Sequence, residues 1–111
     1  MATFLHNKDK NDYEVELRVQ LYKKKFRVDL YEKSTNTIYE FKSAKKAKDA
    51  IGQILVYSLC EPTYKNYDLS TAKLIIVLFD CGKICVSKKL LQKVVKTYNL
   101  KISIDCQCPK R

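Results

Sequence analysis

Glycine, proline, histidine and long apolar runs are scarce in this chain of 111 residues, and each scarcity excludes a class of protein. Gly and Pro number two each, which excludes collagen-like repeats, long flexible linkers and low-complexity tracts. His6 is the only histidine, and a lone His in a polar tail cannot build a Ser-His or Cys-His hydrolase site. The longest apolar run, residues 74–79, is far shorter than the roughly 18 residues that span a bilayer. We therefore expect a single domain over residues 1–111, with a poorly ordered lead-in at 1–11 and no membrane span.

Acidic residues are also few, and the imbalance of charge is informative. Lys and Arg total 22 against 12 Asp and Glu, a net charge of +10. A compact chain with this excess repels itself unless a polyanion neutralises it, and nucleic acid is the commonest such partner. An anionic membrane is less favoured, because no basic amphipathic helix carries Trp or Phe anchors. A basic protein without a specific polyanion remains the alternative.

Five cysteines and the absence of a signal-peptide pattern predict reduced thiols in a cytoplasmic or nuclear setting. Cys60 and Cys85 lie in apolar surroundings and are expected in the core. A zinc-stabilised interaction module is an alternative reading, although neither cysteine spacing is the usual C-x-x-C. Its four thiolates would come from Cys81, Cys85, Cys106 and Cys108.

Hydrophobic periodicity predicts a mixed α/β (α+β) sheet. Residues 13–21 alternate between apolar and polar side chains, which predicts a strand with Tyr13, Val15 and Leu17 on its buried face. Strands at 26–31 and 37–42 follow with a turn-forming segment between them, so the three strands should form an antiparallel meander. A helix at 44–60, a strand buried on both faces at 73–79, a helix at 88–98 and a strand at 101–105 complete the order. Ser43 and Ser87 are expected to cap the two helices.

Two carboxylates and a lysine should converge where the second and third strands pair. Period two places Arg27, Asp29 and Tyr31 on one face, with Val28 and Leu30 on the other. The intervening turn puts Asp29 opposite Glu40 or one diagonal step away, and Lys42 shares the face of Glu40. Paired carboxylates repel unless a cation joins them, and Mg²⁺ favours this kind of site, with the carbonyl of residue 41 as a third ligand. The alternative is a set of ordinary solvated ion pairs.

The sequence resembles the PD-(D/E)XK, or restriction-endonuclease-like, superfamily, and its small phage, viral and bacterial members above all. The resemblance rests on Arg27-Val-Asp-Leu, Tyr39-Glu-Phe-Lys-Ser-Ala-Lys and Ala50-Ile-Gly-Gln-Ile-Leu-Val-Tyr57. It covers residues 13–60 well and the later strand, helix and strand more loosely. Val28 replaces the Pro of the motif, and most of the N-terminal helix of such folds is missing. Glu14 and Glu16 are the possible replacements for the acid that this helix often carries.

The resemblance implies a Mg²⁺- or Mn²⁺-dependent endonuclease that hydrolyses phosphodiester bonds, in DNA first of all. Asp29, Glu40 and the carbonyl of Phe41 would bind the metal, Lys42 would be the catalytic lysine, and Gln53 would approach from the helix. An uncovered sheet face would favour a homodimer. A non-catalytic nucleic-acid-binding or accessory subunit on the same fold is the alternative function. The residues expected to contact nucleic acid are Arg27, Lys24, Lys25, Lys45, Lys46 and Lys48.

Overall fold

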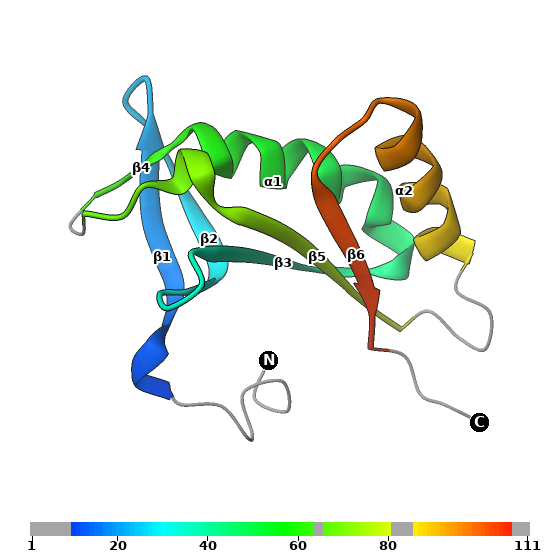
Figure 1. The fold of residues 1–111 in the computed structure, drawn as a ribbon, viewed down its shortest axis with the longest axis horizontal. Helices are drawn as coiled ribbons and strands as arrows, with labels where there is room; N and C mark the ends of the chain where they lie inside the picture. Colours follow the sequence, from blue (N-terminus) through cyan, green and yellow to red (C-terminus); the bar gives the residue numbers. More distant parts are fainter. Residues whose placement is uncertain (1–9, 64–65, 81–85, 108–111) are drawn as a thin grey trace.

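The computed structural model describes residues 10–63, 66–80 and 86–107 as a mixed α+β fold with one six-stranded sheet. The sheet order is β4-β1-β2-β3-β5-β6, and Figure 1 shows the strands beneath two helices. The strands are β1 Tyr13–Leu21, β2 Lys24–Glu32, β3 Thr37–Ser43, β4 Glu61–Pro62, β5 Lys73–Phe79 and β6 Ile102–Cys106.

The predicted meander is confirmed, because β1, β2 and β3 pair antiparallel in succession. The chain then crosses over through α1 (Ala50–Leu59), so that β5 pairs parallel with β3. A second crossover through α2 (Val86–Thr97) places β6 parallel to β5. Three short 3-10 segments complete the order: η1 Lys10–Asp12 precedes β1, η2 Ala44–Asp49 lies between β3 and α1, and η3 Leu69–Thr71 lies between β4 and β5.

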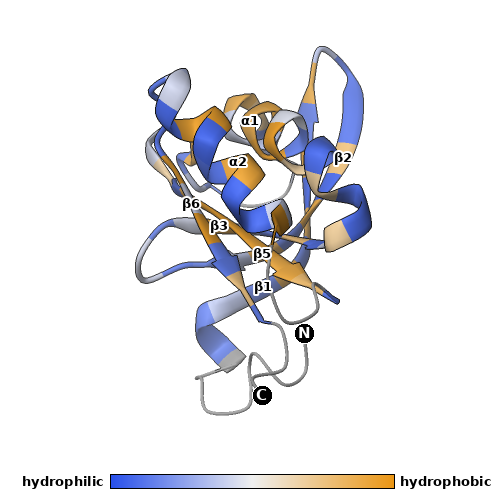
Figure 2. Ribbon diagram, turned by 90° about the vertical axis from the view of Figure 1, so that its right-hand side faces the viewer, coloured by the Kyte–Doolittle hydropathy of each residue, from blue (hydrophilic) through white to orange (hydrophobic). Residues whose placement is uncertain are grey.

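Both helices pack on the same face of the sheet and bury the main core there (Figure 2). Ile54 of α1 and Leu91 of α2 meet Ile76 and Leu78 of β5 in this core. A smaller cluster lies on the opposite face, where Val77 packs with residues of the meander. The prediction that β5 is buried on both faces is therefore confirmed.

The helix predicted at 44–60 is divided into two. Residues 44–49 form the 3-10 segment η2, which bends at Lys46 (φ −108°, ψ 16°), and the α-helix begins at Ala50. The side chain of Ser43 makes no capping hydrogen bond, so the predicted cap is wrong. Ser87 lies inside α2, and its hydroxyl donates to the carbonyl of Ala44 at 3.0 Å, which ties α2 to η2. Without a cap or an acidic first turn, the lysine-rich segment does not start an α-helix.

The expected alternation of the first two strands fails near their middle. Leu17 and Val28 lie in the helix-side core, whereas Leu30, two residues beyond Val28, lies in the cluster on the opposite face. Tyr31 is in the helix-side core, so the prediction that Arg27, Asp29 and Tyr31 share one face is wrong. Glu16, with φ 54°, lies between the register pairs Val15–Leu30 and Leu17–Val28, and this left-handed backbone accompanies the change of face.

The exposure of Val15 is a second departure from the prediction, and it follows from the same change of face. The sequence pattern placed its side chain with Leu17 on the buried face, but it is 50% exposed. Val15 precedes the left-handed residue Glu16 and Leu17 follows it, so the two do not share an environment. The change of face therefore explains why one apolar residue of β1 is left at the surface.

Candidate functional site

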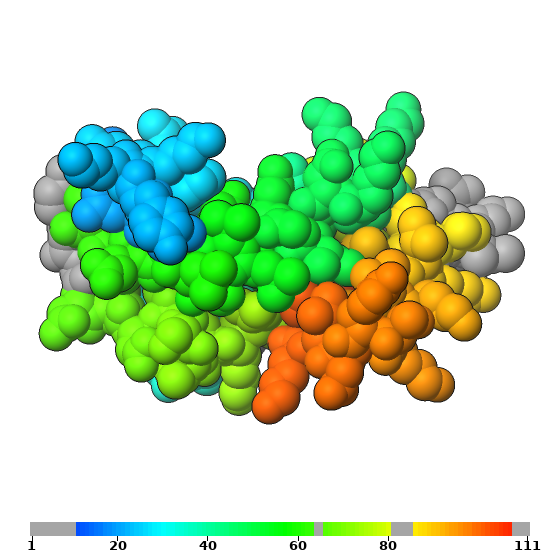
Figure 3. Space-filling view, turned by 90° about the horizontal axis from the view of Figure 1, so that it is seen from above, coloured from blue at the N-terminus to red at the C-terminus, as the bar shows by residue number. Residues whose placement is uncertain are grey.

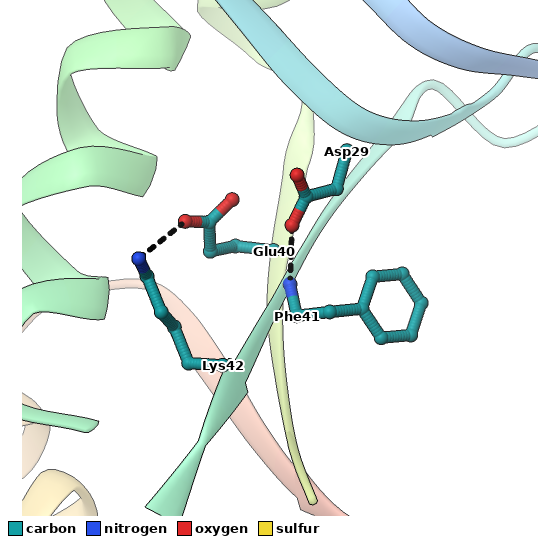
Figure 4. A network of polar contacts seen from close by, with 4 residues as sticks. All are labelled: Asp29, Glu40, Phe41 and Lys42. Carbon is teal, nitrogen blue, oxygen red and sulfur yellow. Dashed lines mark hydrogen bonds and ion pairs between the residues drawn. The ribbon is translucent and has the colours of Figure 1, made fainter. Parts of the chain in front are cut away.

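The pairing of β2 with β3 ends one residue before the two carboxylates of interest. Leu30 faces Tyr39 in the last pair, and the same register would set Asp29 opposite Glu40. Instead, Asp29 Oδ2 accepts a hydrogen bond from the backbone N–H of Phe41 at 2.8 Å (Figure 4). A side chain thus takes the place of a strand partner, because a buried backbone N–H must be satisfied. The two strands part at this point, and we call it the fork.

Glu40 lies at the fork on the helix side of β3 and is almost completely buried, with 2% of the residue exposed. Its Oε2 lies 3.9 Å from Lys42 Nζ, and its Oε1 has no hydrogen-bond partner among the described residues. Burial first, and the nearby Asp29 second, raise the pKa of Glu40 to about 8, and Lys42 lowers it by less. The fork therefore holds an acid that is protonated at neutral pH and lacks a full set of partners.

Lys42 and Phe41 occupy alternate faces of β3, as the period of a strand requires. The Lys42 side chain is 21% exposed, so its ammonium connects the buried Glu40 to the surface. The ring of Phe41 packs with the cluster on the face opposite the helices. The amide and the carbonyl of a strand residue point toward the same neighbouring strand, so the carbonyl of Phe41 is directed to the side of Asp29.

Tyr57 of α1 lies near the fork, and Gln53, which the sequence assigned to the site, lies one helical turn earlier. Gln53 has a buried Oε1 without a hydrogen-bond partner among the described residues. Tyr57 packs against the core and against the ring of Phe26, and burial, then the charges of Glu40 and Asp29, raise its pKa to about 12. Its hydroxyl is thus close enough to both carboxylates to be affected by them. The i, i+4 spacing from Gln53, which puts both on one helix face, was the available signal.

The predicted basic contacts lie outside the fork, in two groups. Lys24, Lys25 and Arg27 belong to β2, and Lys45, Lys46 and Lys48 belong to η2; all six side chains are exposed. In Figure 3 the end of the β1–β2 hairpin (blue) and the segment after β3 (blue-green) project on the same side of α1, with a hollow between them. A polyanion that contacts both segments would therefore lie along one side of α1.

The two possible additional acids have other partners. Arg27 Nη1 lies 4.0 Å from Glu16 Oε1, and both side chains are 65% exposed. Glu14 Oε1 accepts a hydrogen bond from the Tyr67 hydroxyl at 3.3 Å. In the described residues no group of three or more His, Cys, Asp or Glu side chains could hold a metal ion. A cation at the fork would thus rest on two carboxylates and a carbonyl.

The cysteines are only partly described. Cys60 is buried at the end of α1, as predicted for a core residue, and its thiol donates to the carbonyl of Val56 at 3.3 Å. Cys106 is disulfide-bonded, which departs from the expectation of reduced thiols and removes one candidate zinc thiolate. Cys81, Cys85 and Cys108, on which the zinc alternative also depends, lie outside the described residues.

Two findings concern more than the fork: the length of the helices and the similarity of the chain to known proteins. Within the described ranges, no helix is both long and apolar enough to cross a bilayer. No protein-family model, no curated protein and no solved structure matches this chain. The resemblance to the PD-(D/E)XK superfamily therefore stays a prediction that rests on the sequence motifs.

Proposed function

We propose that this protein is a metal-dependent nuclease whose active site is the fork between β2 and β3. The observation that carries the proposal is the buried carboxyl of Glu40, with the half-buried Asp29 and Lys42 beside it. A carboxyl whose pKa is raised by burial and by a neighbouring carboxylate, placed next to an ammonium and close to basic surfaces, suits metal-assisted phosphodiester hydrolysis when no His is present. The net charge of +10 supports a nucleic-acid substrate.

The residues at the fork fit a divalent cation. Among the described residues Glu40 Oε1 has no hydrogen-bond partner, and burial and Asp29 raise the pKa of Glu40, so a cation would relieve both conditions. Asp29, Glu40 and the carbonyl of Phe41 would hold Mg²⁺ or Mn²⁺. Such an ion, when bound, makes water a stronger nucleophile and neutralises charge on the phosphate.

The chain's own residues supply the remaining functions. Lys42 places a positive charge beside Glu40, where it would stabilise negative charge on the substrate phosphate. Gln53 offers an unsatisfied amide oxygen that would orient a water or a sugar hydroxyl at the site. The exposed lysines of β2 and η2 would hold the phosphate backbone without reading its sequence.

Cleavage of supercoiled plasmid in Mg²⁺ and Mn²⁺ tests the proposal. We expect nicked and linear products from the unmodified protein, no product in EDTA, and none from Asp29→Ala or Lys42→Ala. Lys93→Ala removes an exposed lysine of α2 and should cut like the parent protein. If the parent protein binds DNA but never cuts it with either metal, the non-catalytic alternative replaces this proposal. The predicted homodimer stays a prediction, since the structure describes one chain.

A further inference from the structure

The outer end of the β1–β2 hairpin is a basic projection without acidic residues. Residues 17–28, which we call the hairpin arm, contain five Lys and Arg and no Asp or Glu. Figure 1 shows the tip of the arm extending past α1. On the helix side the arm is anchored, because the rings of Phe26 and Tyr57 meet edge to face at 6.3 Å. Its opposite side and its tip carry the charge.

The tip of the arm is a turn of unfavourable composition. Tyr22 (φ 51°) and Lys23 (φ 67°) both adopt the left-handed conformation at the two central positions. Hairpin turns of this kind favour Asn-Gly, because side chains with a Cβ are strained there. The Tyr22 side chain gains no packing in return, since the residue is 94% exposed. Strain that supports an exposed aromatic ring is typical of a functional position.

A cavity beside the tip gathers like charges. It has a volume of about 410 Å³ and is lined by Arg18, Lys25, Phe26, Arg27 and Thr63. Arg18 lies directly opposite Arg27 in the strand register, and like charges in this position repel. The contact of Arg27 with Glu16 is long and solvent-exposed, so it does little to neutralise the pair. An anion with several acceptor oxygens would neutralise this cavity.

We propose that the hairpin arm binds a nucleic-acid strand at a point where bases are unpaired. Phosphate oxygens would occupy the cavity of Arg18, Lys25 and Arg27, and the ring of Tyr22 would stack on an unpaired base. An aromatic ring next to a basic groove is the usual means of binding single strands. This proposal rests on the proposed function in that both require nucleic acid as ligand, and it adds the substrate class: ends, flaps or junctions.

A partial duplex with 2-aminopurine at its first unpaired position tests the stacking, with binding followed by fluorescence and anisotropy in EDTA. We expect quenching on binding, and a loss of affinity of roughly 5- to 100-fold for Tyr22→Ala. Tyr22→Phe keeps the ring and should bind like the parent protein. Tyr98→Ala, at a second exposed tyrosine, should have no effect. Equal binding by Tyr22→Ala and the parent protein would overturn the proposal.

Salt dependence tests the cavity on the same probe. Arg18→Ala and Arg27→Ala should each reduce the slope of log affinity against log salt by about 0.7 to 0.9. Lys89→Ala with Lys93→Ala, on exposed positions of α2, should change it less than either arginine does.

The outcomes separate the two proposals. Binding that depends on Tyr22, without plasmid cleavage, would refute the proposed nuclease activity and support strand binding by the hairpin arm. Cleavage together with binding that does not depend on Tyr22 would support the nuclease and refute strand binding by the arm. No binding to any nucleic acid, or binding only to vesicles that contain phosphatidylserine, would refute both.

Discussion

Glu40 should make the stability of the folded protein fall as the pH rises through the neutral range. Burial, and then Asp29, raise the pKa of Glu40 from 4.5 to about 8 in the folded chain. In the unfolded chain the carboxyl returns to its ordinary value and ionises near 4.5. Between these two values the folded state binds the proton more tightly, so raising the pH favours unfolding. Below 4.5 and above 8 both states carry the same charge at this position, and the effect is constant.

The size of the effect follows from the shift itself. A shift from 4.5 to about 8 is 3.5 pH units, and each unit corresponds to about 1.4 kcal/mol of unfolding free energy. The folded state should therefore lose about 3 kcal/mol between pH 4.5 and 7, and about 5 kcal/mol by pH 9. A domain of this size has a total stability of about 5–15 kcal/mol, so the loss is a large fraction of it. The melting temperature should fall by more than about 10 °C.

Urea unfolding across this pH range, with Glu40→Gln as the matched variant, measures the effect. Gln has the shape of Glu but no proton to lose, so the difference between the two unfolding free energies isolates Glu40. Asp29→Asn removes the second cause of the raised pKa, so the loss of stability should end at a lower pH and be smaller in total. Saturating Mg²⁺ should restore stability to the parent protein above neutral pH and should stabilise Glu40→Gln much less. Parallel curves for the parent protein and Glu40→Gln would refute the reasoning.

Three further predictions follow from other contacts. Lys42→Met removes the charge that lowers the pKa of Glu40, so the loss of stability should extend above pH 8, and cleavage should fall by at least about 100-fold. An unchanged titration would contradict the 3.9 Å pairing. Replacing Tyr22 and Lys23 by Asn and Gly should raise the free energy of unfolding in urea by about 1–3 kcal/mol and weaken binding to the partial duplex. An unchanged free energy of unfolding would mean that the turn is not strained. Asp12→Ala removes the acceptor of two hydrogen bonds from Ser34, at 2.8 Å and 2.6 Å, and should lower the free energy of unfolding by about 1–2 kcal/mol in a thermal melt. Lys33→Ala, in the same turn, is the control for a purely local change.

The fold could be predicted from the sequence where one periodicity is unbroken. The meander, the buried strand β5 and the final helix and strand follow from patterns that extend over whole elements. The start of α1 could not be predicted, because the apolar stripe beginning at Ala47 looks the same for a 3-10 segment and an α-helix. Ser43 and Ser87 match the composition of caps, but their partners are decided by tertiary contacts such as that of Ser87 with Ala44.

The convergence of the three ionic side chains was predictable from the sequence, but its geometry was only partly so. The spacing of Asp29, Glu40 and Lys42 places them at one level of neighbouring strands, and the structure brings them to the same fork. The parting of β2 and β3 was not predictable, because a pairing register assumes that the ladder continues. The position of Tyr57 near the two carboxylates was not predicted, because a tyrosine on an apolar helix face matches the pattern of a core residue.

The positions where strand alternation and turn composition depart from the usual patterns lie close to the residues that the two proposals use. The period of β2 changes between Val28 and Leu30, at the residue whose carboxylate replaces a strand partner for Phe41. Tyr22 and Lys23 break the turn rules at the end of the same hairpin. A chain selected only for stability would pair β2 and β3 further and close the hairpin with Asn-Gly. One departure lies in the turn before β2 and the other within β2, so variants of Tyr22 and Asp29 should separate binding and cleavage from stability most clearly.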